Sequence, residues 1–341
     1  MIRAATKAAI LQHGWTVIGI ADGFDGLIWP EKSRKLELKD VSGLLPRGGT
    51  ILGTTNRGDP FKYKVVQNGR EIVEDMSDEV IGNVGKLGID ALIVIGGDGT
   101  QKIALDLFHR GLNVVGVPKT IDNDLGSTEL TFGFDSALHT VTDAIDKIHT
   151  TAESHHRIMV VEVMGRDAGW IALEAGIAGG AHVILIPEIP FSIDKACDFI
   201  ERRTQNGKRF TVVVVAEGIR VPGEMQARFG PERRARARIG TVGPLIGDAL
   251  GMRLKREVRV TVLGHIQRGG SPSPFDRILS TRFGVAAVEL IAKGEFGKMV
   301  CLRHAIVQSV DLAEAAASIK LVDPDGEIVR TARAIGISFG D

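Results

Sequence analysis

The sequence predicts an α/β protein with parallel sheets, and three observations support this prediction. Short Val- and Ile-rich segments alternate along the chain with longer segments of helical periodicity. The short segments are apolar on both faces, as expected of parallel strands that helices cover on each side. The length of 341 residues favours two domains over one.

The elements follow from this alternation in chain order. An amphipathic helix is predicted over Ile2–Gln12, with no capping residue before it. Seven segments have the composition of strands: Thr16–Ile20, Ala91–Ile95, Asn113–Val117, Ile158–Val163, His182–Ile186, Thr211–Ala216 and Val258–Leu263. Six further helices are predicted between them: Asp78–Leu87, Gln101–Arg110, Asp135–Thr150, Ile193–Gln205, Pro244–Lys255 and Asp276–Ala292. In such sheets, ligands bind at the carboxyl ends of the strands.

Charge and composition exclude several classes of protein. Lys and Arg together number 42 and balance 42 Asp and Glu, which argues against a basic nucleic-acid binder or an acidic tail protein. Cys197 and Cys301 are too few for a disulfide framework or a thiolate metal site, and we expect both to be packing residues. No apolar run approaches the roughly 18 residues of a membrane span, and the start lacks a signal-peptide pattern. We therefore expect a cytoplasmic protein.

Glycine is over-represented, at 42 of 341 residues against a usual share of about 7%. One cluster, Gly96-Gly97-Asp98-Gly99-Thr100, lies between a predicted strand and a predicted helix. Such a turn directs backbone N–H groups and a helix N-terminus at one place, which suits phosphate. The Asp98 carboxylate would repel bare phosphate, so it indicates a bridging Mg²⁺. The alternative interpretation is a tight turn that needs glycine for its backbone conformation.

The next strand ends in a second polar cluster, Lys119-Thr120-Ile121-Asp122-Asn123-Asp124. If this segment is extended, Asp122 and Asp124 point to the same side. One carboxylate could then accept a proton from an attacking hydroxyl while the other assists a metal or orients the first. A lone Asp-Asn-Asp is more often an Asx-rich turn, but its place after a strand end favours the functional interpretation.

Four arginines, Arg157, Arg166, Arg259 and Arg268, flank or follow predicted strands, with His265 between the last two. Arginines at such places can hold a phosphorylated metabolite through paired donors, although each taken singly is more typical of a surface ion pair. A further run of arginines lies within 222–238 and is most simply a solvated loop.

Four motifs occur in one order: Gly-Gly-Asp-Gly-Thr at Gly96, Pro-Lys-Thr-Ile-Asp-Asn-Asp at Pro118, Met-Gly-Arg at Met164, and Leu-Gly-His-Ile-Gln-Arg-Gly-Gly-Ser-Pro at Leu263. In this combination the sequence resembles the 6-phosphofructokinase family, phosphofructokinase A type, in the branch of mixed ATP and pyrophosphate use. The resemblance covers nearly the whole chain. NAD kinase is the nearest alternative through the first motif, but the third and fourth motifs argue against it.

The resemblance implies two Rossmann-like parallel-sheet domains with the active site in the cleft between them. A donor domain would comprise 1–133 plus about 267–317, and a fructose 6-phosphate domain 134–266 plus 318–341. The implied glycolytic reaction is transfer of a phosphoryl group to the 1-hydroxyl of fructose 6-phosphate, which gives fructose 1,6-bisphosphate. The resemblance also implies a homo-oligomer, specifically a homotetramer, in which Arg157 and Arg259 reach a neighbouring subunit's site.

The resemblance assigns roles residue by residue. Asp122 would be the base that accepts the hydroxyl proton, with Asp124 acting nearby, and Thr120 and Arg166 would stabilise the phosphoryl group in flight. Asp98 would hold Mg²⁺. The donor-binding residues would be Arg57, Gly97, Asp98, Gly99, Thr100 and Lys119. The substrate-binding residues would be Thr120, Ile121, Asp122, Arg157, Met164, Gly165, Arg166, Glu217, Arg259, His265, Ile266, Gln267 and Arg268.

Two positions bear on whether the donor is ATP or pyrophosphate. The pyrophosphate-using branch typically has Asp where this chain has Gly99, and Lys where it has Lys119, so the signature is mixed. Gly99 leaves open the space that a nucleotide's α-phosphate needs, whereas Lys119 is a flexible cation that can swing aside. We therefore predict ATP as the donor, with pyrophosphate as the alternative.

The start of the chain departs from the family pattern. Family members begin with a short strand and a Gly-Gly-Asp-x-Pro-Gly-x-Asn turn, and neither is present before Ile2. One hypothesis is a misassigned start codon, which reading the upstream DNA in frame would test. The other hypothesis is a genuine start and an inactive regulatory or binding subunit. The intact catalytic residues favour the first.

Overall fold

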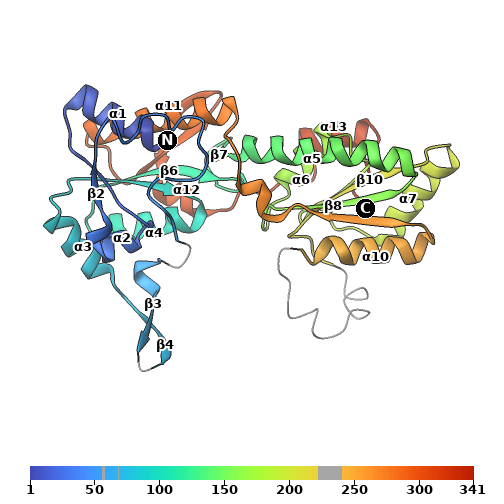
Figure 1. Ribbon diagram of the computed structural model, residues 1–341, viewed down its shortest axis with the longest axis horizontal. Coiled ribbons are helices and arrows are strands. Elements are labelled where there is room, and N and C mark those ends of the chain that lie inside the picture. Colours follow the sequence, from blue (N-terminus) through green and yellow to red (C-terminus); the bar gives the residue numbers. More distant parts are fainter. Residues whose placement is uncertain (56–57, 68, 222–239) are drawn as a thin grey trace. The chain divides into compact units, whose positions relative to one another are not determined.

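The computed structural model describes residues 1–55, 58–67, 69–221 and 240–341. The chain divides into two compact units, each built around its own sheet (Figure 1). Unit 1 comprises Met1–Thr120, Leu125–Phe132 and Ser271–Ile319, and unit 2 comprises Ile121–Asp124, Gly133–Gly270 and Lys320–Asp341. The short segment Ile121–Asp124 belongs to unit 2, although the residues on either side of it belong to unit 1.

Unit 1 contains a sheet with the strand order β13-β12-β6-β5, and β7 (Phe132–Gly133) pairs with β6. The strands β5 (Leu92–Gly96), β6 (Val114–Thr120) and β12 (Lys298–Arg303) are parallel, and β13 (Ile306–Asp311) pairs antiparallel with β12. One buried cluster packs Val94 and Val114 against Leu107 and Leu312, and another packs Val115 and Val117 with Phe283. Apolar side chains on both faces of the sheet thus hold its helices.

The helices of unit 1 confirm most of the predicted pattern. They are α1 (Ile2–His13), α2 (Asp25–Ile28), α3 (Ser77–Lys86), α4 (Asp98–His109), α11 (Pro274–Ala292) and α12 (Leu312–Ala317), with 3-10 turns at Pro30–Lys32 (η1) and Pro60–Lys62 (η2). The short helices α2 and α12 were not predicted, because helices of this length carry too little periodicity. The strands β12 and β13 were not predicted either.

Two antiparallel pairs of short strands complete unit 1. The strand β1 (Val17–Gly19) pairs with β2 (Arg34–Leu36), and β3 (Tyr63–Gln67) forms a hairpin with β4 (Arg70–Glu74). The expectation of a parallel, fully covered strand over Thr16–Ile20 is therefore wrong. The observed strand has three residues and is only partly buried, so its apolar run was too short to distinguish the two cases.

Unit 2 is built on a parallel sheet with the strand order β11-β8-β10-β9. All six residues of β8 (Ile158–Val163) and of β10 (Thr211–Ala216) are buried, as are those of β9 (Val183–Leu185). The strand β11 (Val258–Val262) lies at the edge and is half-exposed, so the prediction that it is covered on both faces is wrong. An edge strand has a neighbour on one side only, which the sequence cannot reveal.

The helices of unit 2 are α5 (Phe134–His155), α6 (Trp170–Ala178), α7 (Ile193–Gln205), α10 (Val242–Leu254) and α13 (Glu327–Ala334). The bounds of α7 and β10 coincide with the predicted ones. The helix α6 escaped prediction because, apart from Glu174, its residues are apolar or small, so it shows no periodic stripe. Cys197 and Cys301 are both buried and unpaired with each other, as packing residues would be. Among the described residues, no helix has the length and apolarity needed to cross a membrane.

Candidate active site

The glycine loop of unit 1 connects β5 to α4. The helix begins at Asp98, so Gly99 and Thr100 belong to its first turn rather than to a loop before the helix. Gly97 caps the helix without a side-chain hydrogen bond, which leaves the first N–H groups available to an anion. A side chain at Gly96 would overlap Thr100, whereas one at Gly99 would meet no atom within 4 Å. The loop is therefore closely packed at Gly96, whereas the space next to the Gly99 Cα is empty.

Asp98 has the properties of a ligand for a divalent cation. Its Oδ2 pairs with Lys102 Nζ at 2.9 Å. Its Oδ1 is buried and has no hydrogen-bond partner among the described residues. A buried carboxylate oxygen of this kind fits a hard cation such as Mg²⁺, which commonly takes one or two protein carboxylates and completes its shell with phosphate and water. In the described part of the chain, no group of three or more His, Cys, Asp or Glu side chains is arranged to hold a metal ion.

Thr120 ends β6 beside this loop. A Cβ at Gly97 would lie 3.5 Å from the Thr120 Cβ, so the two backbones run close together. Thr120 is 8% exposed, and its carbonyl accepts a hydrogen bond of 2.9 Å from Thr131 Oγ1. Lys119, by contrast, is exposed. Unit 1 thus brings together Gly97, Asp98, Gly99, Thr100 and Thr120 of the predicted site.

Gln101 is a residue of this region that sequence reasoning did not single out. It lies on α4, is fully buried, and its Nε2 donates 3.0 Å hydrogen bonds to both the Gly96 and the Val117 carbonyls. Its Oε1 occupies the space where a side chain at Gly116 would lie. One amide therefore links the end of β5 to the middle of β6. A polar residue on the buried face of a helix was the signal that could have revealed it.

In unit 2, Ile121–Asp124 form a turn whose four side chains are all buried. Asp122 is 3% and Asp124 is 6% exposed. Asn123 has a φ of 52°, in the left-handed region that Asn tolerates. The segment is therefore not extended, and the premise that spacing alone places both carboxylates on one side is wrong. The turn instead buries both carboxylates through its own curvature.

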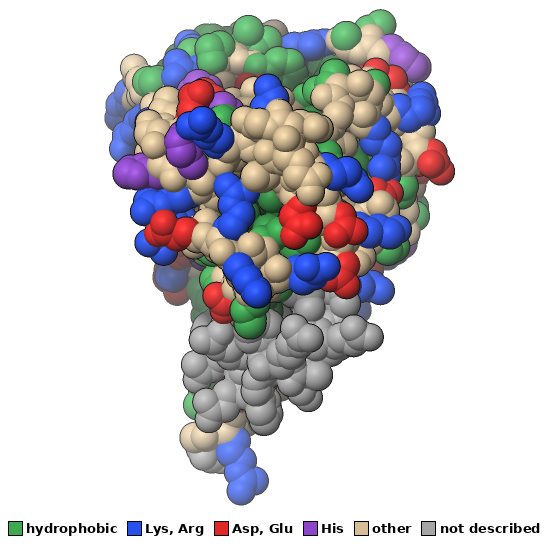
Figure 2. Space-filling model, turned by 90° about the vertical axis from the view of Figure 1, so that its right-hand side faces the viewer, with side chains coloured by type: hydrophobic (Ala, Val, Ile, Leu, Met, Phe, Trp, Pro, Cys, Tyr) green, Lys and Arg blue, Asp and Glu red, His purple; other side chains and the backbone are tan. Residues whose placement is uncertain are grey.

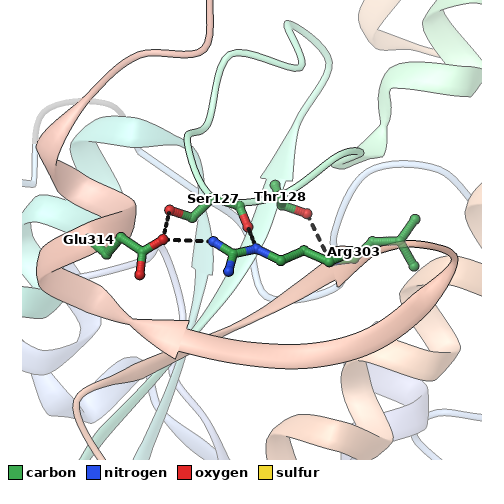
Figure 3. A network of polar contacts seen from close by, with 5 residues as sticks. Ser127, Thr128, Arg303 and Glu314 are labelled. Atoms are coloured by element: carbon green, nitrogen blue, oxygen red, sulfur yellow. Dashed lines mark hydrogen bonds and ion pairs between the residues drawn. The ribbon is translucent and has the colours of Figure 1, made fainter.

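The residues that follow this turn in unit 1 are anchored to β12 and α12 (Figure 3). Arg303 Nε donates to the Ser127 carbonyl at 3.1 Å, and Arg303 and Ser127 Oγ both reach the Glu314 carboxylate. Thr128 Oγ1 accepts from the Leu302 N–H at 3.0 Å. This network fixes the chain immediately beyond the aspartate turn.

Arg166 lies beside Asp122. Its Nε is 3.6 Å from Asp122 Oδ2, and its side chain is 63% exposed, so the guanidinium reaches from solvent to a buried carboxylate. Arg166 has a φ of 51°, in the left-handed region. Its carbonyl oxygen packs against Gly218, and a side chain at position 218 would overlap that oxygen. Gly218 is a second residue that the sequence did not reveal, because the contact joins segments 52 positions apart.

Glu217 supports the same loop. Its Oε1 accepts from the Arg166 N–H at 3.1 Å, while its Oε2 is buried with no partner among the described residues. Burial raises the pKa of the Glu217 carboxyl, and the charges of Asp122 and Glu162 raise it further, against the lowering effect of the backbone N–H groups of Arg166 and Gly165. An unsatisfied buried acceptor of this kind suits a hydroxyl donor such as a sugar provides.

The motif at Leu263 forms the 3-10 turn η3 (Gly264–Arg268) after β11. Gln267 is buried there, and its side chain accepts from the Met164 N–H at 3.2 Å and donates to the Gly264 carbonyl at 3.0 Å. His265, Ile266 and Arg268 of the same turn are exposed. The structure therefore brings the Met164–Arg166 loop, Glu217 and η3 together at the carboxyl ends of β8, β10 and β11.

Arg157 and Arg259 lie elsewhere. Arg157 precedes β8 and Arg259 is the second residue of β11, so both belong to the amino end of the sheet. Arg157 Nε is 3.0 Å from the Glu257 carboxylate, which Arg259 also contacts, and the hydrogen bond with Arg157 lowers the pKa of Glu257. Figure 2 shows basic and acidic side chains interspersed on the face that it presents. Arg57 and the arginine-rich segment lie outside the described residues.

Comparison with known proteins places the chain in a family of phosphoryl-transfer enzymes. The family model described as "Phosphofructokinase" matches residues 1–291, and the chain belongs to this family. It is 52% identical over 342 residues to the ATP-dependent 6-phosphofructokinase of Chloroflexus aurantiacus, covering 100% of this chain and 93% of that protein. It is 47% identical to the pyrophosphate–fructose 6-phosphate 1-phosphotransferase of Amycolatopsis methanolica, over 95% of this chain and 92% of that protein.

The fold prediction is confirmed by a solved structure of the same family. The phosphofructokinase of Saccharomyces cerevisiae superposes with a TM-score of 0.77 at 32% identity. The match covers 93% of this chain and 42% of the yeast chain.

Proposed function

We propose that this chain is an ATP-dependent 6-phosphofructokinase, which phosphorylates the 1-hydroxyl of fructose 6-phosphate. The observation that carries the proposal is the buried Asp122 carboxylate with Arg166 3.6 Å away, in a turn that follows directly on Thr120 of the glycine-loop unit. A carboxylate so placed can accept a proton, and an adjacent guanidinium can stabilise a transferring phosphoryl group. The curated relative with 52% identity bears the corresponding name.

In the proposed mechanism unit 1 binds the phosphoryl donor. The uncapped N-terminus of α4 and the open space above Gly99 receive the donor phosphates, and Thr100 and Thr120 lie beside that path. Asp98 would hold Mg²⁺ through its unsatisfied Oδ1. Bound there, the ion would neutralise developing charge on the phosphates. Lys119, exposed at the end of β6, adds a positive charge for the donor.

Unit 2 binds the sugar phosphate in this proposal. Glu217 Oε2 accepts a sugar hydroxyl, and the exposed His265 and Arg268 of η3 are free to turn toward the ligand's phosphate. Asp122 takes the proton of the 1-hydroxyl as the hydroxyl oxygen attacks the γ-phosphorus, while the bond from that phosphorus to the β,γ-bridging oxygen breaks and ADP leaves. Arg166 stabilises the equatorial oxygens, and Asp124, buried in the same turn, acts nearby as a second carboxylate.

A pyrophosphate-dependent reaction is the second candidate, because Lys119 is present and a relative with 47% identity is named for that activity. Initial rates with ATP and with pyrophosphate, each with fructose 6-phosphate and Mg²⁺ in a coupled assay, separate the two. We expect turnover with ATP. Activity with pyrophosphate alone would reverse the assignment, and no activity with either donor would overturn the proposed function.

We further propose that the active form is a homo-oligomer, specifically a homotetramer, in the cytoplasm. Its support is the position of Arg157 and Arg259 at the amino end of the unit 2 sheet, away from Met164, Arg166 and Glu217 at the carboxyl end. Two arginines on that edge can serve a sugar phosphate bound to another copy of the chain. Light scattering of the purified protein gives the mass that tests the tetramer.

A further inference from the structure

The aspartate turn is held from one side by the C-terminal part of the chain. The Lys320 N–H donates a 2.8 Å hydrogen bond to the carbonyl of Asp124. Immediately before it, Leu125 and Ile319 form an isolated antiparallel bridge. A segment almost 200 residues away in sequence therefore determines where the last residue of the catalytic turn lies.

Lys320 is itself held by Trp170. The indole Nε1 donates a 2.9 Å hydrogen bond to the Lys320 carbonyl, and Lys320 Nζ lies 5.2 Å from the centroid of the Trp170 ring. Two residues further on, the Val322 N–H donates to Glu188 Oε1 at 2.9 Å. The side chains of Trp170 and Glu188 thus fix the Lys320–Val322 backbone. The hydrogen bond from the Lys320 N–H in turn restrains Asp124.

Trp170 is a rigid support for this contact. It is the first residue of α6, whose following residues Ile171, Ala172 and Leu173 are fully buried. The N–H of Gly169, directly before it, donates to the same Glu188 Oε1 at 2.9 Å. Trp170 also comes four residues after Arg166, so the helix that carries it is continuous with the loop that we assign to the sugar phosphate.

On these contacts, and resting on the proposed function, we propose that Trp170 is a positioning residue that couples the Met164–Arg166 loop to the Asp122–Asp124 turn through the backbone of Lys320. One direct link between the loop and the turn is the Arg166–Asp122 ion pair, whose guanidinium is 63% exposed. An exposed side chain holds geometry weakly. The partly buried hydrogen bonds from Trp170 to Lys320 and from Lys320 to Asp124 provide the stiffer connection.

Trp170→Phe tests the proposal, because it removes the N–H donor and keeps an aromatic ring under Lys320. We expect kcat to fall about 3- to 10-fold, the effect of losing one hydrogen bond that orients the base, with KM for ATP unchanged. KM for fructose 6-phosphate should change less than kcat, because the loss affects the placement of Asp122 rather than the binding of the sugar phosphate. Trp29→Phe, at an exposed site in unit 1, is the matched control and should change none of these.

Lys320→Met separates the hydrogen bonds from the cation–ring contact, since it keeps both backbone bonds. It should lose less activity than Trp170→Phe. An equal loss in both variants would overturn the proposal, as would a Trp170→Phe enzyme with the parent's kcat. Thermal unfolding of each variant shows whether a loss of kcat is merely a loss of folded protein.

Tryptophan fluorescence tests the coupling without substituting Trp170. The chain has three tryptophans, so Trp15→Phe combined with Trp29→Phe leaves Trp170 as the sole indole. Fructose 6-phosphate should change its emission, and ATP alone should not. If calorimetry shows that fructose 6-phosphate binds while the emission stays constant, the coupling is refuted. If fructose 6-phosphate does not bind to the parent enzyme at all, the proposed function itself fails.

Discussion

Asp122 is the residue on which the proposed chemistry depends most directly. It is 3% exposed and lies 3.6 Å from Arg166 Nε. Asp122→Asn keeps the size of the side chain and removes its capacity to accept a proton. We expect kcat to fall about 10²- to 10⁴-fold while KM for both substrates stays within a few-fold. Steady-state kinetics with both substrates varied provides the measurement, and near-parental kcat would exclude Asp122 as the base.

Gly99 is the residue that we expect to determine the donor. A carboxylate introduced by Gly99→Asp would stand in the open space over the first turn of α4 and repel nucleotide phosphates. KM for ATP should rise by about tenfold or more. Gly99→Asn adds the same volume without the charge and is the matched control, so a similar rise in both variants would point to bulk rather than repulsion.

Most residues of the candidate site were predictable because they belong to motifs at strand ends. The supporting residues were not, since their roles arise from partners distant in sequence. Gln101 acts on Val117, and Gly218 makes room for the carbonyl of Arg166. Trp170 reaches the carbonyl of Lys320. Such contacts exist only once the strands and helices have been assembled.

At the scale of elements, Gln101 of α4 links the strands β5 and β6 through two hydrogen bonds. Gln101→Leu would remove both hydrogen bonds to Gly96 and Val117 while filling much of the same buried volume. Each lost bond and the carbonyl it leaves unsatisfied cost about 1 kcal/mol, so the free energy of unfolding should fall by about 2 kcal/mol. KM for ATP should also rise, because Gly96 begins the donor loop. Urea titration and kinetics test both effects, and unchanged values would show that the tie is dispensable.

The helix α6 contains a buried acid whose titration affects stability. Burial raises the pKa of Glu174 to about 7, against the opposing effect of Lys320 and with a smaller contribution from Asp135. A carboxyl whose pKa is raised on folding favours the folded state while protonated, so its contribution falls as pH rises from about 4.5 to about 7.

Glu174→Gln should therefore stabilise the protein at pH 8, by roughly 1–3 kcal/mol, and have little effect at pH 4.5. Denaturant unfolding at the two pH values measures the difference. Glu314→Gln, at an exposed acid whose pKa Arg303 lowers, is a control that should not stabilise at pH 8. An equal effect of Glu174→Gln at both pH values would contradict the titration.

Periodicity predicted the long elements well, because a strand such as β10 or a helix such as α7 has one consistent pattern over its length. It failed where an element has no polar face or few residues. The helix α6, in which Glu174 is the single charged residue, lacks a stripe, and the three-residue β1 gave no information on its antiparallel partner. The exposure of β11 depends on its place at the sheet edge.

At the scale of the whole molecule, the order of motifs along the chain is what identified the two-sheet architecture, because each sheet carries its motifs at the carboxyl ends of parallel strands. Arg157 and Arg259 lie at the amino end of the unit 2 sheet, and a single copy of the chain gives them no role in the proposed site. Their partner within the chain is Glu257, on a half-exposed edge. In an oligomer the same arginines can complete the site of a second copy.

Complementation between two inactive variants tests this arrangement. If Arg157 serves a neighbouring copy, Asp122→Asn and Arg157→Ala lack different halves of one shared site. Co-expressed, they form mixed oligomers in which an intact Asp122 of one copy meets an intact Arg157 of another, so activity should rise well above that of either variant alone. Glu257→Gln releases the ion pair but keeps both arginines, and it should remain active by itself. If the co-expressed pair shows no more activity than the two variants assayed separately, each copy completes its own site.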